Sequence, residues 1–193
     1  MKAVYQLAKS GQDEWYTPMA AVEPIVPYIK GTAWCPFDTE DSAFVKVLRR
    51  NGVKVVHTHI ATGDDFFETE RECDVVVSNP PYSLRTPIIK RLYALGKPWA
   101  MLFGMSGIFE NKERVAMYKQ YGVQVMYLSP RVQFIDPINH KVDNPPFQSG
   151  YVCWNLLPKD LMFATVRKEK QQIDGQMDLM SMLADDGQAR LAW

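Results

Sequence analysis

An alternation between short apolar runs and helix-length segments constrains the fold of this 193-residue chain more than any other feature. Each run is short and rich in β-branched or apolar residues, as expected of a buried strand. Because parallel strands are joined by crossover connections, strands that alternate with helices predict an α/β fold with a mostly parallel sheet covered on both faces. The five runs are Thr32–Phe37, Val53–Ile60, Cys73–Ser78, Pro98–Phe103 and Val123–Leu128.

Three segments between the runs carry signals for the start and end of a helix. Each begins near a small polar residue that can cap a first turn, and in one of them a proline takes the first helical position. Each also ends at a glycine, the residue that most often follows a helix. The predicted helices follow Ser42, Thr86 and Asn111 and end at Gly52, Gly96 and Gly122.

The end of the chain departs from this alternation. Arg131–Ile135 and Gly150–Leu157 have the composition of two further strands, joined by a 14-residue loop over residues 136–149. We expect them to form a C-terminal antiparallel hairpin that closes the sheet, and a loop of this length is usually functional or mobile. Residues 1–165 are therefore expected to form one domain, followed by a helical or mobile tail over 166–193.

Charge and cysteine content exclude several classes of protein. The 22 basic and 22 acidic residues cancel, so the chain lacks the overall basic excess typical of nucleic-acid-binding proteins. Residues 84–141 nevertheless carry nine Lys or Arg against three Asp or Glu. This local surplus fits either a solvated helix surface or a phosphate-binding path. Three dispersed cysteines, Cys35, Cys73 and Cys153, predict buried hydrophobic side chains rather than a disulfide framework or a zinc site.

The apolar runs are far shorter than the ~20 residues that a membrane-spanning helix needs. The N-terminus has no apolar stretch behind basic residues, so it does not resemble a secretion signal. We therefore expect a soluble cytoplasmic protein.

The tetrapeptide Asn79-Pro80-Pro81-Tyr82 directly follows the run that ends at Ser78. Ligands of open α/β sheets bind beyond the carboxyl ends of the strands, where this tetrapeptide is expected to lie. The two prolines fix the backbone, so an asparagine side-chain oxygen and a proline carbonyl can both accept hydrogen bonds from one planar amino group. Tyr82 adds a flat ring for stacking. The motif therefore predicts a site that holds an amine in line with an electrophile and catalyses by positioning.

This motif resembles the catalytic motif of S-adenosylmethionine-dependent amino-methyltransferases. The whole chain resembles the EcoRI-type adenine-specific DNA methyltransferases, which phages often encode, with landmarks from residue 13 to residue 154. The resemblance implies a Rossmann-like methyltransferase fold over 1–165, S-adenosylmethionine as the cofactor, and methyl transfer to the N6 amine of adenine in DNA. It makes Asn79, Pro80, Pro81 and Tyr82 the catalytic residues. A target base in a duplex would have to be flipped out to reach them.

The resemblance also assigns cofactor-binding residues. Residues 16–18 are similar to the segment that touches the methionine end of the cofactor, and residues 65–66 to the pair that holds its adenine. Residues 36–37 resemble the pair that opens the turn after the first strand. Asp38 then becomes a candidate acceptor for the cofactor's amino group, and His59 a candidate donor to its ribose. The full set is Tyr16, Thr17, Pro18, Pro36, Phe37, Asp38, His59, Asp65 and Phe66.

Two departures from the family pattern affect this site. The turn over residues 36–42 contains no glycine, and its carboxylates Asp38, Glu40 and Asp41 would repel the carboxylate of a bound cofactor. His57 and His59 stand where an acidic residue for the ribose hydroxyls is expected. Both histidines lie on one face of a predicted strand, but no third ligand is near in sequence, so we predict no metal site.

The substrate-binding residues are predicted in the later part of the chain. Arg131–Ile135 resembles the family's late motif, in which an aromatic side chain supports the extruded base. Phe134 is the candidate for that role, with an ordinary core residue as the alternative. Arg131 and Lys141 belong to the basic segment and are candidate phosphate contacts. A second string, Asn144-Pro145-Pro146-Phe147, follows no apolar strand and is interpreted as a turn.

Other functions fit the same acceptor pair. Adenine in RNA and a glutamine amide in a protein offer similar donors, and the missing glycines are compatible with a non-catalytic binding protein that retains the fold. The sequence indicates neither a recognition site nor an oligomeric state.

Overall fold

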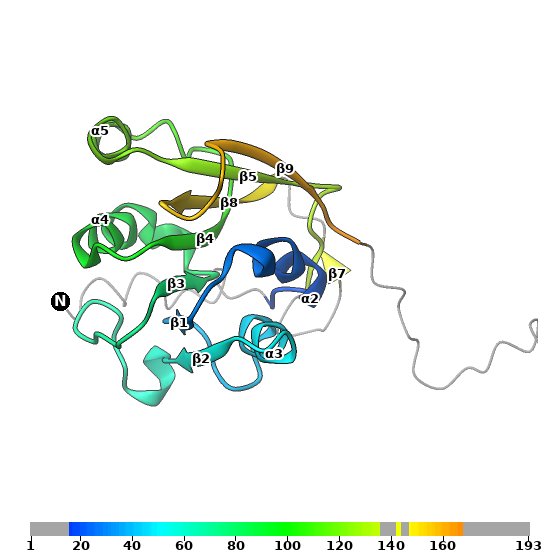
Figure 1. Ribbon diagram of the computed structural model, residues 1–193. Coiled ribbons are helices and arrows are strands. Elements are labelled where there is room, and N and C mark those ends of the chain that lie inside the picture. The colour runs from blue at the N-terminus through cyan, green and yellow to red at the C-terminus, as the bar shows by residue number, and fades with distance from the viewer. Residues whose placement is uncertain (1–15, 136–141, 144–146, 168–193) are drawn as a thin grey trace, which may run out of the picture.

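The computed structural model describes residues 16–135, 142–143 and 147–167. Its centre is a seven-stranded sheet in the order β2-β1-β3-β4-β8-β5-β9 (Figure 1). Helices α4 and α5 lie on one side of this sheet, and α2 and α3 lie on the other. Four of the six strand pairings are parallel. The predicted Rossmann-like α/β class, with a mostly parallel sheet and an antiparallel part near the C-terminus, is confirmed.

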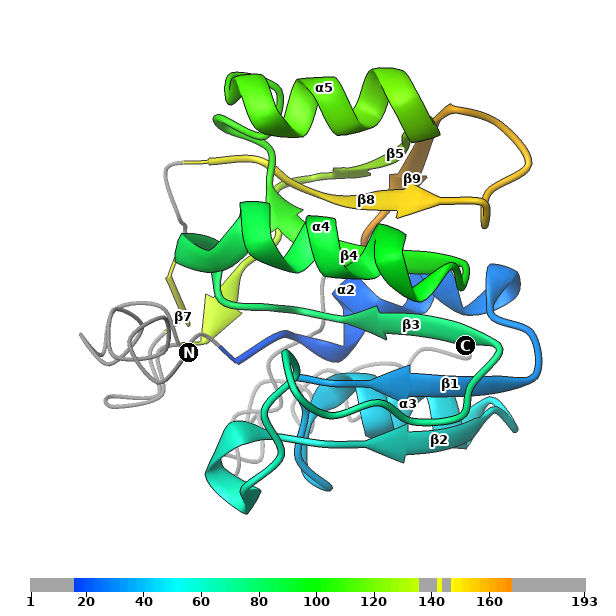
Figure 2. The same cartoon turned by 90° about the vertical axis from the view of Figure 1, so that its left-hand side faces the viewer.

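The parallel half of the sheet is made from the first four predicted runs. The strands are β1 (Thr32–Cys35), β2 (Lys54–His57), β3 (Val75–Ser78) and β4 (Trp99–Gly104). All residues of β3 and β4 are buried, as expected of central strands covered by helices on both faces. The carboxyl ends of β1, β2 and β3 lie at one edge of the sheet, the left edge in Figure 2.

The antiparallel strand β8 (Ser149–Trp154) lies between β4 and β5 (Gln124–Ser129) and pairs with both. The hairpin was expected between Arg131–Ile135 and Gly150–Leu157, and that pairing is wrong. In the structure, β6 (Phe134–Ile135) pairs with β7 (Val142–Asp143) in a separate two-stranded sheet. The run before the predicted hairpin, β5, is the strand that pairs with β8, because the inner position lets β8 form hydrogen bonds along both edges.

Two strands were not predicted, β7 within the expected loop and β9 in the main sheet. Strand β9 (Leu161–Thr165) pairs in parallel with β5 at the edge of the sheet. It alternates exposed and half-buried residues, and its exposed positions include Leu161 and Phe163. Large apolar residues on the exposed face conceal the apolar–polar alternation by which a half-buried strand is recognised.

The predicted helices occur with one shifted boundary. Helix α3 (Ala43–Arg50) starts after Ser42, and α5 (Lys112–Tyr121) starts after Asn111, whose side chain accepts a hydrogen bond from the Arg114 amide. Helix α4 (Arg85–Leu95) begins before Thr86, because the short helix η4 (Tyr82–Leu84) leads directly into it. Two further short helices precede β1, α2 (Met19–Val22) and η2 (Glu23–Tyr28), and η3 (Ile60–Thr62) follows β2.

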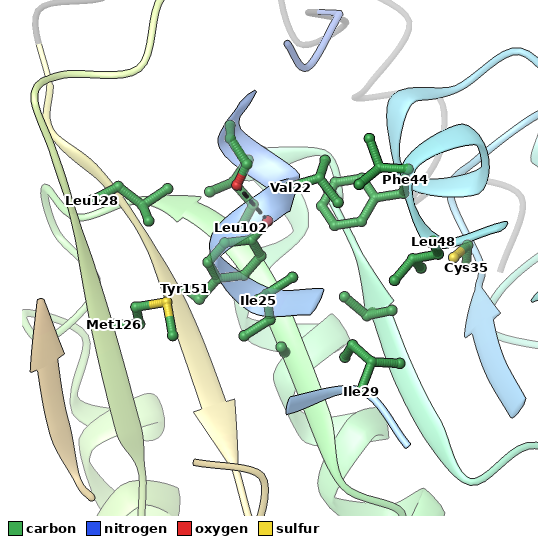
Figure 3. Packing of buried hydrophobic residues seen from close by; sticks show 14 of the residues in the cluster. Val22, Ile25, Ile29, Cys35, Phe44, Leu48, Leu102, Met126, Leu128 and Tyr151 are labelled. Carbon is green, nitrogen blue, oxygen red and sulfur yellow. Dashed lines mark hydrogen bonds between the residues drawn. The ribbon is translucent and has the colours of Figure 1, made fainter. Parts of the chain in front are cut away.

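Two apolar clusters fill the two sides of the sheet. One packs α2, η2 and α3 against β1, β3 and β8, and it includes Ile25, Phe44 and Tyr151 (Figure 3). The other packs α4 and α5 against Trp34, Trp99 and further residues of the opposite sheet face. Tyr151 is fully buried, and its hydroxyl donates to the carbonyl oxygen of Ala21 at 2.9 Å. This bond ties α2 to the centre of the sheet.

All three cysteines are free and buried, as predicted, and burial raises the pKa of the Cys35 thiol well above its ordinary value. Within the residues that the structure describes, no helix combines the length and apolar character needed to cross a bilayer.

Candidate active site

The candidate site lies where two neighbouring parallel strands, β1 and β3, end. Strand β3 ends at Ser78 and leads into Asn79, while β1 ends at Cys35 and leads into the turn that contains Asp38. The two strands pair directly, with Ala33 opposite Val75. Their turns therefore leave the sheet side by side, and the buried Ser78 hydroxyl donates a short hydrogen bond to the Asp38 carboxylate. The sequence-predicted catalytic and cofactor segments are thus joined directly.

Asn79 carries the most informative polar atoms of the site. Its amide nitrogen Nδ2 donates to Thr17 Oγ1 at 3.0 Å, although the two residues are 62 positions apart. Its carbonyl oxygen Oδ1 is buried and has no hydrogen-bond partner among the residues that the structure describes. Leaving a buried acceptor unsatisfied costs about 1 to 3 kcal/mol. Asn79 therefore presents a fixed acceptor that is suited to a donor from outside the protein.

Asp38 is a buried carboxyl group, 5% exposed. Burial raises its pKa to about 7, and hydrogen bonds from Ser78 and Ser42 only partly oppose this shift. Its backbone amide donates to the Thr58 carbonyl at 3.2 Å, which fixes the turn to the segment that follows β2. Near neutral pH, this carboxyl group therefore carries only part of a negative charge.

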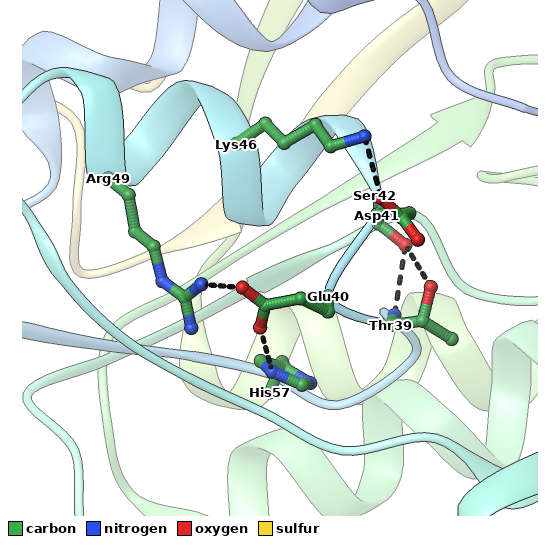
Figure 4. Close-up of polar contacts among 7 residues, drawn as sticks. All are labelled: Thr39, Glu40, Asp41, Ser42, Lys46, Arg49 and His57. Carbon is green, nitrogen blue, oxygen red and sulfur yellow. Dashed lines mark hydrogen bonds and ion pairs between the residues drawn. The ribbon is translucent and has the colours of Figure 1, made fainter.

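The other two carboxylates of the turn form ion pairs (Figure 4). Glu40 contacts Arg49 of α3 and also His57 Nε2, at 2.8 Å from Glu40 Oε2. The hydrogen bond from Arg49 is the largest of the interactions that lower the pKa of Glu40. Asp41 lies 2.9 Å from the Lys46 ammonium group. The repulsion expected from three carboxylates is thus largely compensated, because two are paired with cations and the third is partly protonated.

The aromatic residue of the motif, Tyr82, lies in a cluster of rings. Its ring centroid is 5.9 Å from that of Phe103 and 5.7 Å from that of Phe147, and the Arg85 guanidinium carbon lies 5.1 Å from it. Phe147, which ends the second Asn-Pro-Pro string, was not predicted to lie beside the motif. The only signal for it in the sequence was the repetition of the Asn-Pro-Pro string. The second copy was interpreted as a turn because no strand precedes it.

The remaining cofactor candidates fall into exposed, half-buried and buried groups. Tyr16 is 57% exposed, and Pro18 is half-buried beside Thr17. Asp65 Oδ1 accepts from the Phe67 amide at 2.8 Å and so supports a local turn. His59 caps η3, with its Nδ1 accepting from the Ala61 amide at 3.1 Å.

Phe66 lies in the core of the α4 side. Its ring is 1% exposed and packs 4.9 Å from the ring of Phe37, 5.6 Å from that of Trp34 and 5.4 Å from the Arg91 guanidinium carbon. Pro36 is also buried, while Phe37 is half-buried. Phe66 therefore supports Phe37 from the core, and Phe37 is the more accessible of the two rings.

The substrate candidates differ in their surroundings. Phe134 is 2% exposed and lies in the apolar cluster of the α2 and α3 side, whereas Tyr82 packs against the cluster on the opposite side. Arg131 is exposed, and Lys141 lies outside the described residues. Arg114, part of the basic segment, is buried and donates to three groups of the protein.

Elsewhere, the described part of the chain offers a cavity but no cluster of metal-binding side chains. No group of three His, Cys, Asp or Glu side chains suited to a metal ion occurs in the described part of the chain. A cavity of about 680 Å³ lies between η2, the end of α3 and the end of β9, where Lys30, Arg50 and Thr165 are among its lining residues. None of the candidate site residues lines this cavity.

Comparisons with known proteins give no sequence match and a distant likeness among solved structures. No protein-family model matches the chain, and no curated protein sequence matches it. Among solved structures, the fold is similar to a Listeria monocytogenes protein assigned provisionally to the class I S-adenosylmethionine-dependent methyltransferases. That alignment covers 86% of this chain and 71% of the other, with 12% sequence identity and a TM-score of 0.45. Neither value is high enough to assign a family.

Proposed function

We propose that this chain is a methyltransferase that transfers a methyl group from S-adenosylmethionine to the N6 amine of adenine in DNA. The observation that carries the proposal is the buried Oδ1 of Asn79, which has no partner among the described residues and follows the carboxyl end of β3. This is the edge at which open α/β sheets bind their ligands. An exocyclic amine, with two donors in one plane, matches this acceptor and the neighbouring Pro80 carbonyl.

The residues of the motif act by holding the amine. Thr17 accepts from Asn79 Nδ2, so the amide is oriented with its oxygen toward the site. When Asn79 Oδ1 accepts a hydrogen bond from the substrate N–H group, electron density shifts toward the amine nitrogen and its direction of attack is fixed. The alkylated nitrogen then loses its extra proton to water, so the site needs no strongly basic side chain.

The residues around the β1 turn fit S-adenosylmethionine as the cofactor. When bound, it supplies a methyl group made electrophilic by a positively charged sulfur. The buried Asp38 carboxyl group lies one hydrogen bond from Ser78 and so next to Asn79. Because Glu40 and Asp41 are paired with cations, the turn can accept the cofactor's own carboxylate. Thr17, Pro36, Phe37, Asp38, His59 and Asp65 are the residues proposed to hold it.

The DNA assignment is supported by the basic segment 84–141. The Lys90 side chain is 72% exposed, with its ammonium group 3.9 Å from the Glu113 carboxylate, and Lys112 and Arg131 are exposed as well, so all three cations lie on the surface, where phosphates bind. Arg114 is removed from this set by its burial. An adenine in a duplex would have to leave the stack to reach Asn79.

Transfer of a labelled methyl group tests the proposal directly. Purified protein is incubated with S-adenosylmethionine labelled in its methyl group and, separately, with duplex DNA, single-stranded DNA, RNA and a glutamine-rich protein. We expect label in N6-methyladenine of DNA for the wild type and at least ~100-fold less for Asn79→Ala. Label in RNA or in a glutamine side chain would replace the substrate, and binding of the cofactor without any transfer would favour the non-catalytic alternative.

A further inference from the structure

The second Asn-Pro-Pro string ends at Phe147, which one residue, Gln148, separates from β8. Antiparallel pairing of β8 with β4 places Gly104 opposite Ser149, and the Met105 amide donates to the Gln148 carbonyl at 2.8 Å. The Gln148 side chain also donates to the Leu128 carbonyl. These bonds anchor the backbone beside Phe147 to the end of β4 and to β5.

Gly104 leaves the space that the Phe147 ring occupies. A Cβ atom on Gly104 would lie 2.8 Å from Cδ2 of Phe147 and 3.1 Å from its Cε2. The φ angle of Gly104 is outside the left-handed region, so the backbone itself does not require glycine. The glycine is therefore explained by the ring that packs on it.

The Phe147 ring also contacts the aromatic residue of the catalytic motif. The centroids of Phe147 and Tyr82 are 5.7 Å apart, with an angle of 62° between the ring planes, an edge-to-face arrangement. Phe103 and Arg85 contact Tyr82 from other directions. Of these three neighbours, Phe147 is the farthest from Tyr82 in the sequence.

We propose that Phe147 is a positioning residue, which holds the Tyr82 ring in the orientation that the acceptor site at Asn79 requires. The proposal rests on the proposed methyltransferase function and deepens it. Tyr82 begins the short helix η4 directly after the Pro80-Pro81 pair, so its backbone is held by the helix and its ring moves by rotation of its own side chain. Loss of the Phe147 contact removes one of the three neighbours that hold the ring, without touching Asn79, Thr17 or the β1 turn.

A spectroscopic experiment tests the contact without using activity. The ring resonances of Tyr82 are assigned by their loss in Tyr82→Phe, with NMR of protein carrying labelled tyrosine. Phe147→Leu should shift and broaden these resonances, because it removes a neighbouring aromatic ring, while Phe163→Leu, at a 73% exposed phenylalanine on β9, should leave them unchanged. Unaltered Tyr82 resonances in Phe147→Leu would overturn the proposal, whatever the activity.

A kinetic experiment tests the consequence for catalysis. We expect Phe147→Leu to lower kcat about 10- to 100-fold, the range expected of a small misplacement, with the KM for S-adenosylmethionine unchanged. Phe147→Tyr retains the ring and should restore most of kcat. Gly104→Ala should lower kcat as Phe147→Leu does, and Gly104→Ala with Phe147→Ala should be no worse than Phe147→Ala alone, because the crowded ring is gone.

Three results separate this proposal from the proposed function. A wild-type protein that transfers no methyl group to any substrate refutes the proposed function, and with it any catalytic role for Phe147, even if the Tyr82 resonances shift. Shifted resonances with full activity in Phe147→Leu refute the positioning role alone. A kcat that falls equally in Phe147→Leu and Phe147→Tyr also refutes it, because the ring would then not be what matters.

Discussion

At the residue scale, the site depends on one amide whose two ends have different surroundings. Asn79 Nδ2 donates a hydrogen bond to Thr17, and Oδ1 is buried with no hydrogen-bond partner among the described residues. An amide fixed at one end presents its other end in a single direction, so no ordering is needed when a donor arrives.

The first prediction concerns this amide. Asn79→Ala removes one of two proposed acceptors and should lower methyl transfer at least ~100-fold, the usual cost of losing one preorganised polar group. The affinity for S-adenosylmethionine, measured by calorimetry, should change little. Asn111→Ala, which removes a capping side chain from α5, is the matched control and should lower thermal stability but not transfer. Near-normal turnover in Asn79→Ala would place the acceptor elsewhere.

The second prediction concerns the buried carboxyl group of Asp38. Its folded-state pKa is raised from 3.8 to about 7, so the folded protein binds a proton more tightly than the unfolded chain. The sign of this shift means that the free energy of unfolding falls as pH rises between these two values. Asp38→Asn cannot ionise and should lose this dependence.

Urea unfolding at pH 5 and at pH 8 measures the effect. Relative to Asp38→Asn, the wild type should lose about 2 to 3 kcal/mol of unfolding free energy between these two values. The exposed Glu68→Gln serves as a control and should retain the wild-type slope. Parallel curves for wild type and Asp38→Asn would show that Asp38 is ionised in the folded protein at pH 5.

At the scale of elements, the sequence predicted those whose signals are local. Strands β1 to β5 were recognised from apolar β-branched runs, and the ends of α3, α4 and α5 from Gly52, Gly96 and Gly122. The partner of β8 could not be predicted, because an antiparallel strand carries no mark of the neighbour that it pairs with. Strand β9 was missed because Leu161 and Phe163 are exposed although they are apolar.

The third prediction separates a structural cation from a phosphate-binding one. Arg114 of α5 donates to the carbonyls of Gly107 and Ile108, at 2.5 and 3.1 Å, and to Thr86 Oγ1 at 2.6 Å. It therefore ties the loop after β4 to α4. Arg114→Ala should lower the free energy of unfolding by about 2 to 4 kcal/mol, because it leaves one buried and two half-buried acceptors without their partner.

The exposed Lys112 on the same helix is the control for this third prediction. Chemical unfolding should show little change for Lys112→Ala. If Arg114→Ala were as stable as the wild type, the three hydrogen bonds would not contribute to the fold, and Arg114 would return to the set of candidate DNA contacts.

At the scale of the whole molecule, the candidate site is an assembly of distant segments. The tetrapeptide and its position after β3 were predictable, because both are local. The bond between Thr17 and Asn79 and the packing of Phe147 on Tyr82 were not, because each joins residues that only the folded sheet brings together. The charge of Glu40 in the acidic turn is likewise balanced by Arg49 of α3 and His57 of β2, which lie in two different elements.

The charge distribution of the whole chain leads to the last prediction, which tests whether the substrate is DNA. Net charge is zero, so DNA affinity must come from a local surface, and the exposed cations of segment 84–141 are the candidates. Phosphate contacts release counterions, so affinity falls with salt, with a slope of about one unit per contact. Lys112→Gln with Arg131→Gln should therefore weaken binding to all duplexes alike and flatten the salt slope by up to about two units.

Fluorescence anisotropy with a labelled duplex, at several salt concentrations, measures this slope. Lys54→Gln, an exposed lysine on β2 outside the basic segment, should leave the slope unchanged. Since phosphate contacts carry no sequence information, the double variant should retain whatever base preference the wild type shows. A DNA affinity that is independent of salt, or too weak to measure at low salt, would exclude duplex DNA and direct the search to RNA or a protein amide.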